Sequence, residues 1–295
     1  MKKTIAAFLL SPFLCFGQAS DPHLFFMETS SGRIAYRDTG GSGFPVVFIH
    51  GNSCSSEVFK KQFAHFGKQY RLIAMDLPGH GKSDNAKDPD IAYTIPGYAK
   101  ILDEVATLLQ LNPFVVVGFS LGGNIALQWT QITDRIKGVM MVSSAPTKYS
   151  EEAFIAYPPY EGSHAGSPDQ LTELQALQYM KAVGFDVEDA SVYFMVRDAM
   201  RTDGTARAKM VESVLAGKGM DETKIVSQLP IPLSVVIGKE DCAVGIEYIV
   251  HLPYRNLWRN KVELLPGAQH AVVLHQADQL HGLLEDFLLE MVPKS

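Results

Sequence analysis

One short stretch, residues 115–123, constrains the fold of this chain more than any other. A run of three valines leads directly into Gly-Phe-Ser-Leu-Gly, and the apolar residues at 124–129 then recur with helical spacing. A strand buried in a parallel sheet is apolar throughout, and a change to a period of 3.6 residues marks a helix. The stretch therefore predicts a strand, a tight turn and a helix, with Ser120 at the turn.

Ser120 is a candidate nucleophile because of this predicted turn. On such a turn the serine takes a strained backbone conformation, and Gly118 and Gly122 leave room for the neighbouring strand and helix. Its hydroxyl then stands exposed above the sheet. Gly-x-Ser-x-Gly also occurs in ordinary glycine-rich loops, so the prediction depends on a base, an acid and an anion-binding site elsewhere in the chain.

The remaining pattern predicts an α/β fold. We expect eight strands, at 24–29, 32–37, 45–49, 71–75, 115–117, 136–142, 233–237 and 261–265. Helical spacing occurs at 56–66, at 94–109 and over the last apolar face, 280–291. Strands that alternate with helices indicate a mostly parallel sheet that is covered by helices on both faces.

Residues 145–229 interrupt the alternation, because they show helical spacing without a convincing strand. We interpret them as a helical cap between the sixth and seventh strands, with 20–144 and 230–295 as the core. The cap would cover the carboxyl edge of the sheet, where open α/β sheets bind ligands. Its methionine and aromatic residues could line an adaptable apolar pocket or form the cap's own core.

The first nineteen residues differ from the rest. Lys2 and Lys3 precede an uncharged, mostly apolar run at 5–16, and Gly17-Gln18-Ala19 follows. A charged start, a short apolar region and small residues at a cleavage site are typical of a secretory signal, and the run is too short to span a membrane. We expect cleavage near Ala19, a periplasmic or secreted protein, and no stable membrane insertion afterwards.

Composition excludes several classes of function. The net charge of -6 and the absence of a Lys/Arg cluster argue against nucleic-acid binding. No phosphate-binding glycine loop and no zinc-spaced His/Cys cluster occurs, so we expect no cofactor and no metal. Cys54 and Cys242 follow the third and seventh strands, about 14 Å apart in a parallel sheet. We expect no disulfide between them, since bonded cysteines need Cα atoms within about 7 Å.

The best candidate for the base is His270. A serine hydroxyl is a weak nucleophile and needs a base within hydrogen-bond reach, itself oriented by a carboxylate. His270 follows the eighth strand, on a loop at the carboxyl edge of the sheet. The other eight histidines fall in glycine-flanked turns, helices, the cap or the segment before the first strand.

The acid should follow the sixth or the seventh strand. The sixth ends in Ser143-Ser144-Ala145-Pro146, which has no carboxylate, whereas the seventh ends in Gly238-Lys239-Glu240-Asp241. We choose Asp241, with Glu240 as the alternative if the strand ends one residue earlier.

An oxyanion hole needs two fixed donors aimed where negative charge develops. The backbone N–H of Leu121, next to the candidate nucleophile, is one. The second should come from His50-Gly51-Asn52-Ser53 after the third strand, and we choose the N–H of Asn52. Because a backbone donor survives a side-chain mutation, Asn52→Ala is predicted to be mild.

Taken together, these motifs resemble the α/β-hydrolase superfamily. They are the run 50–53, Asp-Leu-Pro-Gly-His-Gly-Lys-Ser at 76–83, the turn at 118–123, the run 238–241, and His270. Within the superfamily the chain resembles the α/β-hydrolase-fold N-acyl-homoserine lactonases, by the runs 28–35, 76–83, 201–207 and 256–258. The resemblance implies Ser120, Asp241 and His270 as a triad, with Asn52 and Leu121 as oxyanion donors. It also implies a cap tyrosine against the lactone, for which Tyr179 is the candidate.

The leading hypothesis is a serine hydrolase that cleaves a carboxylic ester or lactone with an apolar acyl part, through an acyl-enzyme. Hydrolysis of a C–C bond, with the same triad, is an alternative. A catalytically silent ligand-binding protein on this scaffold is another, although an apparently complete triad argues against it.

Overall fold

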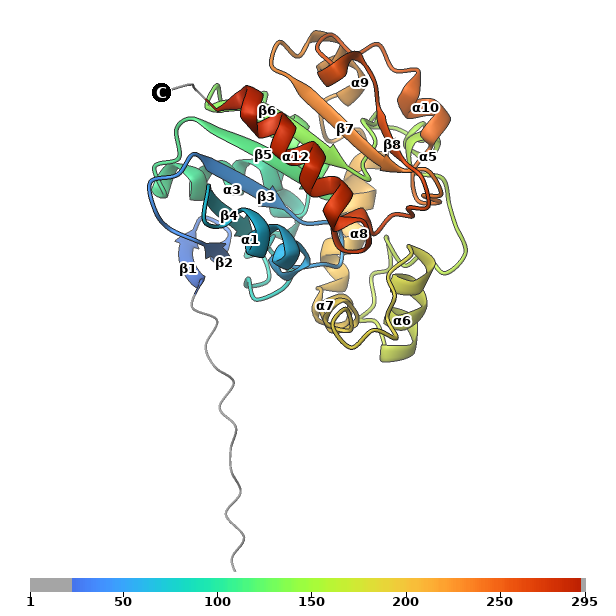
Figure 1. Cartoon of the computed structure of the whole chain (residues 1–295). Helices are drawn as coiled ribbons and strands as arrows, with labels where there is room; N and C mark the ends of the chain where they lie inside the picture. The colour runs from blue at the N-terminus through green and yellow to red at the C-terminus, as the bar shows by residue number, and fades with distance from the viewer. Residues whose placement is uncertain (1–22, 293–295) are drawn as a thin grey trace, which may run out of the picture.

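Eight strands form one sheet in the computed structural model, which describes residues 23–292 (Figure 1). The strands are β1 (Leu24–Thr29), β2 (Gly32–Asp38), β3 (Pro45–Ile49), β4 (Arg71–Met75), β5 (Phe114–Phe119), β6 (Ile136–Val142), β7 (Leu233–Gly238) and β8 (Glu263–Leu265). Their order across the sheet is β1-β2-β4-β3-β5-β6-β7-β8. The predicted α/β class is confirmed.

Most of the sheet is parallel. β1 and β2 form an antiparallel hairpin, β2 pairs antiparallel with β4, and every later pair is parallel. The carboxyl ends of β3 to β8 therefore meet at one edge, and the loops that carry the candidate site residues follow these ends.

Helices follow every strand from β3 onward. They are η1 (Ser56–Phe59), α1 (Lys60–Phe66), α2 (Pro89–Ala92), α3 (Ile95–Leu108), α4 (Leu121–Trp129), α5 (Ala153–Ala156), α6 (Glu173–Ala182), α7 (Phe194–Arg201), α8 (Gly204–Leu215), α9 (Glu222–Gln228), α10 (Ile246–Val250), η2 (Trp258–Asn260), α11 (Val272–His275) and α12 (Ala277–Met291). Thr94 caps α3 by accepting a hydrogen bond from the N–H of Gly97, and proline in the first turn suits this helix start.

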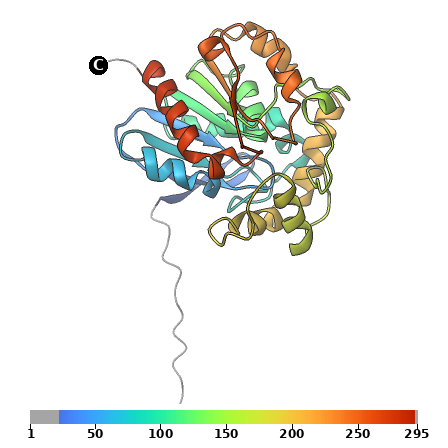
Figure 2. The ribbon, with the colours of Figure 1, turned by 45° about the vertical axis from the view of Figure 1, so that its right-hand side comes forward.

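The two faces of the sheet carry separate halves of the core. Along β3, Val47 and Ile49 point to the face covered by α3 and α4, whereas Val46 and Phe48 point to the face covered by α1 and α12. Figure 2 shows α12 across the second face. Full burial on both faces explains why these strands read as continuous apolar runs.

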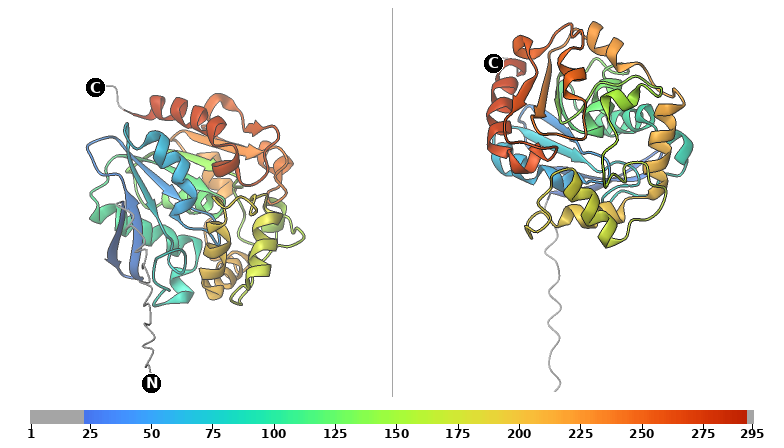
Figure 3. Two further views of the ribbon diagram at one scale, coloured as in Figure 1. Left: turned by 60° about the horizontal axis from the view of Figure 1, so that its bottom comes forward. Right: turned by 90° about the vertical axis from the view of Figure 1, so that its right-hand side faces the viewer.

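The interval between β6 and β7 contains α5 to α9 and no strand among its residues. α6 and α7 pack side by side, outside the helix layers that cover the sheet (Figures 2 and 3). Ile225 and Val226 of α9 belong to the core cluster on the α4 side, and so do residues of α5 and α8. α9 leads the chain back to β7, and the helices before it, α5 to α8, are called the covering segment below. The division into core and cap remains a prediction.

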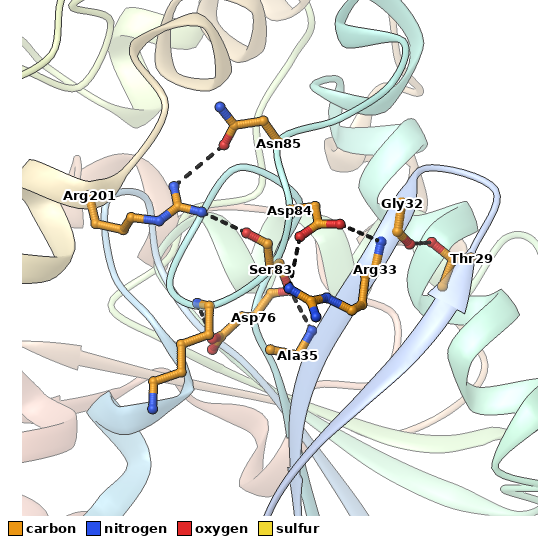
Figure 4. Close-up of polar contacts among 10 residues, drawn as sticks. Thr29, Gly32, Arg33, Ala35, Asp76, Ser83, Asp84, Asn85 and Arg201 are labelled. Carbon is orange, nitrogen blue, oxygen red and sulfur yellow. Dashed lines mark hydrogen bonds and ion pairs between the residues drawn. The ribbon is translucent and has the colours of Figure 1, made fainter. Parts of the chain in front are cut away.

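α7 is fastened to the loop after β4, which carries the motif at 76–83. The guanidinium of Arg201 donates to the carbonyl of Ser83 at 2.7 Å and to Asn85 Oδ1 at 3.4 Å (Figure 4). The carboxylate of Asp76 shapes the same loop by accepting from the N–H of Lys82 at 2.8 Å. These motif residues therefore position the covering segment.

Several smaller expectations can be compared with the structure. β8 begins at Glu263 rather than at residue 261, because Arg259 and Asn260 adopt left-handed backbone conformations just before it. Cys54 and Cys242 are both free, as expected. The predicted signal at 1–19 lies outside the described residues. Across residues 23–292, no helix has the length and apolar character needed to cross a membrane.

Candidate active site

Ser120 lies between the last residue of β5 and the first residue of α4, as the motif predicts. Its backbone has φ 52° and ψ -122°, a conformation that costs a non-glycine residue about 1–3 kcal/mol. The surrounding sheet holds it there, since the N–H of Ser120 donates to the carbonyl of Val142 at 2.9 Å.

The glycines at the turn permit two close approaches. A Cβ atom at Gly118 would lie 2.3 Å from the carbonyl oxygen of Gly122, and one at Gly122 would lie 2.1 Å from the carbonyl oxygen of Ile49. The first contact is with α4 and the second with β3. Both positions therefore require glycine for steric reasons, as the sequence indicates.

His270 meets Ser120 from the loop after β8. Its Nε2 lies 2.9 Å from Ser120 Oγ, and its Nδ1 lies 2.8 Å from Asp241 Oδ2. A carboxylate only accepts hydrogen bonds, so Nδ1 carries the proton and Nε2 is left to accept from the serine hydroxyl. This is the arrangement in which a histidine can take the proton of Ser120.

Asp241 is buried and held in place. Its side chain has no exposed surface, and its Oδ1 accepts from the N–H of Ala243 at 2.9 Å. Glu240, the alternative acid, has its side chain exposed instead. The structure thus brings Ser120, His270 and Asp241 together and leaves Glu240 out.

Leu121 and Asn52 both border the space beside Ser120. Leu121 is the first residue of α4, and the first amides of a helix have no acceptor within it. Asn52 lies in the loop after β3, where a Cβ atom at Gly51 would be 3.0 Å from Ser120 Cβ. The side chain of Asn52 has a contact that the sequence did not predict, because its amide donates to the carbonyl of Ala165 at 2.8 Å.

A cavity of about 310 Å³ opens beside these groups and is mostly apolar. Its lining comes from the core loops and from residues of the predicted cap, among them Phe154, Tyr160, Met180, Phe185 and Met210. Tyr179, the candidate implied by the resemblance, also lines it and is buried. A cavity of this size and character suits a small, largely apolar molecule.

Sequence reasoning missed a hydrogen-bonded group of three polar residues beside the cavity. Asn124 and Tyr157 line it, and Glu222 binds Asn124 from behind. The position of Asn124, in the first turn of α4 and four residues after Ser120, was a usable signal because this turn starts at the nucleophile. Tyr157 is one of the cap aromatics that the sequence offers as pocket lining, but its bond to Asn124 and the approach of Glu222 depend on tertiary packing that the sequence does not show.

Within residues 23–292, no group of three or more His, Cys, Asp or Glu side chains is arranged to hold a metal ion. The groups beside the cavity are instead those of acid–base and nucleophilic chemistry. A hydroxyl, an imidazole and a carboxylate in one hydrogen-bonded chain can make an oxygen nucleophile, provided that a substrate carbonyl reaches Ser120.

Comparisons with known proteins agree with this fold. The family model described as the alpha/beta hydrolase fold matches residues 45–163. A crystal structure of the N-acyl homoserine lactonase AidH, a variant complexed with N-hexanoyl homoserine lactone, is 32% identical with a TM-score of 0.86. That match covers 91% of this chain and 98% of the lactonase.

Two more distant relatives have different descriptions. A monoacylglycerol lipase of Homo sapiens is 23% identical over 267 residues, covering 86% of this chain and 78% of the lipase. An uncharacterised protein of Mycobacterium tuberculosis is 25% identical over 266 residues, covering 84% of this chain and 76% of that protein. Sequence, fold and comparisons lead to one conclusion: the chain belongs to the α/β-hydrolase family.

Proposed function

We propose that this protein is a serine hydrolase that cleaves a carboxylic ester or lactone through an acyl-enzyme. The observation that carries the proposal is the hydrogen-bonded chain from Ser120 through His270 to Asp241, at the wall of an apolar cavity. Among the relatives, enzymes named as lactonase and lipase support action on esters.

In the first half-reaction, Ser120 Oγ would attack the carbonyl carbon while its proton moves to Nε2 of His270. Asp241 would stabilise the resulting imidazolium through Nδ1–H. The negative charge that develops on the carbonyl oxygen would be met by the N–H groups of Leu121 and Asn52. The carbon–oxygen bond to the alcohol then breaks, and the alcohol oxygen takes the proton from Nε2.

In the second half-reaction, water would attack the acyl-enzyme and give its proton to Nε2 of His270. Collapse of the second tetrahedral intermediate breaks the bond to Ser120 Oγ, which recovers the proton, and a carboxylic acid leaves. With a lactone substrate the alcohol of the first step remains attached to the acyl group, so one open-chain hydroxy acid is released.

Within this class we propose N-acyl-homoserine lactones as the preferred substrates. The support is the 32% identity to the lactonase AidH over almost its whole length, together with an apolar cavity that can hold an acyl chain. Tyr179 borders this cavity and is the cap residue that we propose contacts the lactone.

The test compares homoserine lactones of several acyl lengths with simple p-nitrophenyl esters, using the protein without residues 1–19 and Ser120→Ala as the blank. Ser120→Ala should lose nearly all turnover, on the order of a millionfold if the three residues act as a unit. Reaction with a fluorophosphonate at Ser120 would separate an enzyme from a silent binder. Appreciable activity in Ser120→Ala would refute the mechanism, and hydrolysis of short esters alone would refute the lactone preference.

A further inference from the structure

One wall of the cavity is built from residues that carry polar groups. Asn124, Thr147 and Tyr157 all border the space beside Ser120, next to apolar side chains such as Ile95 and Val214. Free polar groups here would disfavour an apolar substrate, because covering an unpaired polar group with apolar atoms costs free energy. What this wall can bind therefore depends on whether its polar groups already have hydrogen-bond partners within the protein.

The amide group of Asn124 is completely occupied. Its Nδ2 donates to the carbonyl of Ala145 at 2.8 Å and to Glu222 Oε2 at 2.6 Å. Both partners only accept, so they use the two N–H bonds of the amide and fix which end is oxygen. The Oδ1 atom consequently faces Tyr157, whose hydroxyl donates to it at 2.5 Å.

The hydroxyl of Tyr157 is occupied as well. Besides donating to Asn124, it accepts from the N–H of Ala145 at 3.0 Å, with Ser144 Oγ at 3.3 Å. No donor is left for a substrate, and the tyrosine contributes its ring to the cavity. The hydroxyl of Thr147 donates to the carbonyl of Lys148 at 3.4 Å. The polar groups of this wall are therefore paired within the protein, and the surface that they leave for a substrate is apolar.

Glu222 determines this arrangement from behind the wall. It is fully buried at the first residue of α9, and its carboxylate accepts from four uncharged donors. Oε2 receives Asn124 and the N–H of Thr147, and Oε1 receives the hydroxyl of Tyr149 at 2.9 Å and Gln128 Nε2 at 3.3 Å. A buried carboxylate with no cationic partner is costly, which suggests a role other than stability.

We propose that Glu222 is a specificity-determining residue, because it fixes the amide of Asn124. The fixed amide keeps the polar groups of this wall hydrogen-bonded within the protein, and the wall then binds the apolar part of the substrate. The inference rests on the proposed ester or lactone hydrolysis and assigns a place to its acyl group. Glu222 itself touches no substrate and acts through Asn124 and Tyr157, so it is a positioning residue.

The test measures kcat and KM for p-nitrophenyl octanoate and p-nitrophenyl acetate. Burial raises the pKa of Glu222 to about 7, so assays at about pH 8.5 keep the carboxylate ionised. In Glu222→Leu the amide of Asn124 loses an acceptor and can turn toward the cavity. We expect the octanoate-to-acetate ratio of kcat/KM to fall about tenfold or more, mainly through the KM for octanoate.

Two variants examine the route of the effect. Glu222→Gln can still accept from Asn124 and Thr147 through its amide oxygen. Its NH₂ group faces Tyr149, whose hydroxyl can turn to accept, and only the 3.3 Å bond from Gln128 Nε2 is lost. It should keep the wild-type ratio within about threefold. Asn124→Leu frees the hydroxyl of Tyr157 and should lower the ratio as Glu222→Leu does, and the double variant should be no worse than either single one.

Glu212→Leu is the matched control, because Glu212 is exposed on α8 and does not line the cavity. Fluorophosphonate labelling of Ser120 shows which variants are folded. If Glu222→Leu does not label, Asn124→Leu decides the question. An unchanged octanoate-to-acetate ratio in a labelled Glu222→Leu or Asn124→Leu variant would overturn the inference. So would a ratio in Glu222→Gln as low as that expected for Glu222→Leu. Neither result would bear on the proposed function. Failure of the unmutated protein to label or hydrolyse either ester would overturn the proposed function itself.

Discussion

The hydrogen bond between Ser120 and His270 depends on a backbone conformation that few serines adopt. The positive φ angle of Ser120 turns its side chain away from the direction of β5, and the glycines at 118 and 122 allow the helix to start at once. His270 can then approach from a loop 150 positions away in the sequence. The local strain is held by the sheet on one side and by α4 on the other.

Asp241 rather than Glu240 is predicted to be the acid that orients His270. Asp241→Asn removes the acceptor that fixes the proton on Nδ1, and should lower kcat by roughly 10³–10⁴-fold. Glu240→Gln is the matched control, since its exposed side chain lies outside the hydrogen-bonded chain. Steady-state kinetics on one ester would check this, and a larger loss in Glu240→Gln would reverse the assignment.

Asn52→Ala should lower kcat/KM by about twofold to tenfold. Its backbone N–H is retained, but the bond from its side chain to the carbonyl of Ala165 is lost, and such bonds contribute about 0.5–1.5 kcal/mol. The measurement is kcat/KM for an ester with Ser120→Ala as blank. A loss above a hundredfold would mean that the side chain itself takes part in the reaction.

At this scale the sequence was informative wherever a motif fixed local geometry. Ser120 follows from its pentapeptide, and His270 and Asp241 follow from their places after two strands. Tyr157 and Glu222 could not be predicted, because their positions beside α4 depend on how distant segments pack. The same reason hid the contact between Asn52 and the cap.

Among the elements, α7 joins the covering segment to the core through groups whose charge depends on pH. Asp198 accepts from the hydroxyl of Ser55 at 2.5 Å. Burial raises the pKa of Asp198 to about 8, and the nearby carboxylates of Asp76 and Glu57 act in the same direction. At neutral pH this carboxyl therefore keeps a proton that an unfolded chain would release.

The free energy of unfolding should consequently fall as pH rises from about 4 to about 8, because the folded state binds the proton of Asp198 more tightly than the unfolded state does. Asp198→Asn should reduce this slope. Thermal unfolding midpoints at about pH 5 and pH 8 would test it, with Asp278→Asn as an exposed control on α12. An unchanged or steeper slope in Asp198→Asn would contradict the prediction.

Helices and strands with a clear hydrophobic pattern were the ones that the sequence predicted. β1, β3, β4 and β6 begin and end at the expected residues, because both flanks carry turn signals. The short helices α2, α10 and α11 were not predicted, since four or five residues carry too little periodicity. α9 belongs to the predicted cap by its helical spacing, and that assignment stays a prediction.

For the whole molecule, we propose export through the segment at 1–19. Residues 1–295 expressed in a Gram-negative bacterium should appear in the periplasm with an amino terminus near Ser20. A variant that lacks residues 2–19 should remain in the cytoplasm. Fractionation and amino-terminal sequencing would measure both. An uncleaved product in the cytoplasm would contradict the proposal.

The bond pair between Thr147 and Glu222 has a consequence for how such a protein can change. The N–H of Glu222 donates to the carbonyl of Thr147 at 3.0 Å, and the N–H of Thr147 donates back to the carboxylate of Glu222 at 3.0 Å. Residues 147 and 222, at the two ends of the interval that holds α5 to α8, are thus hydrogen-bonded to each other. If the predicted cap is a separate unit, a descendant could exchange the segment between these two residues while the strands, which all lie outside it, keep their pairing. The range of substrates could then change in evolution while the catalytic residues stay the same.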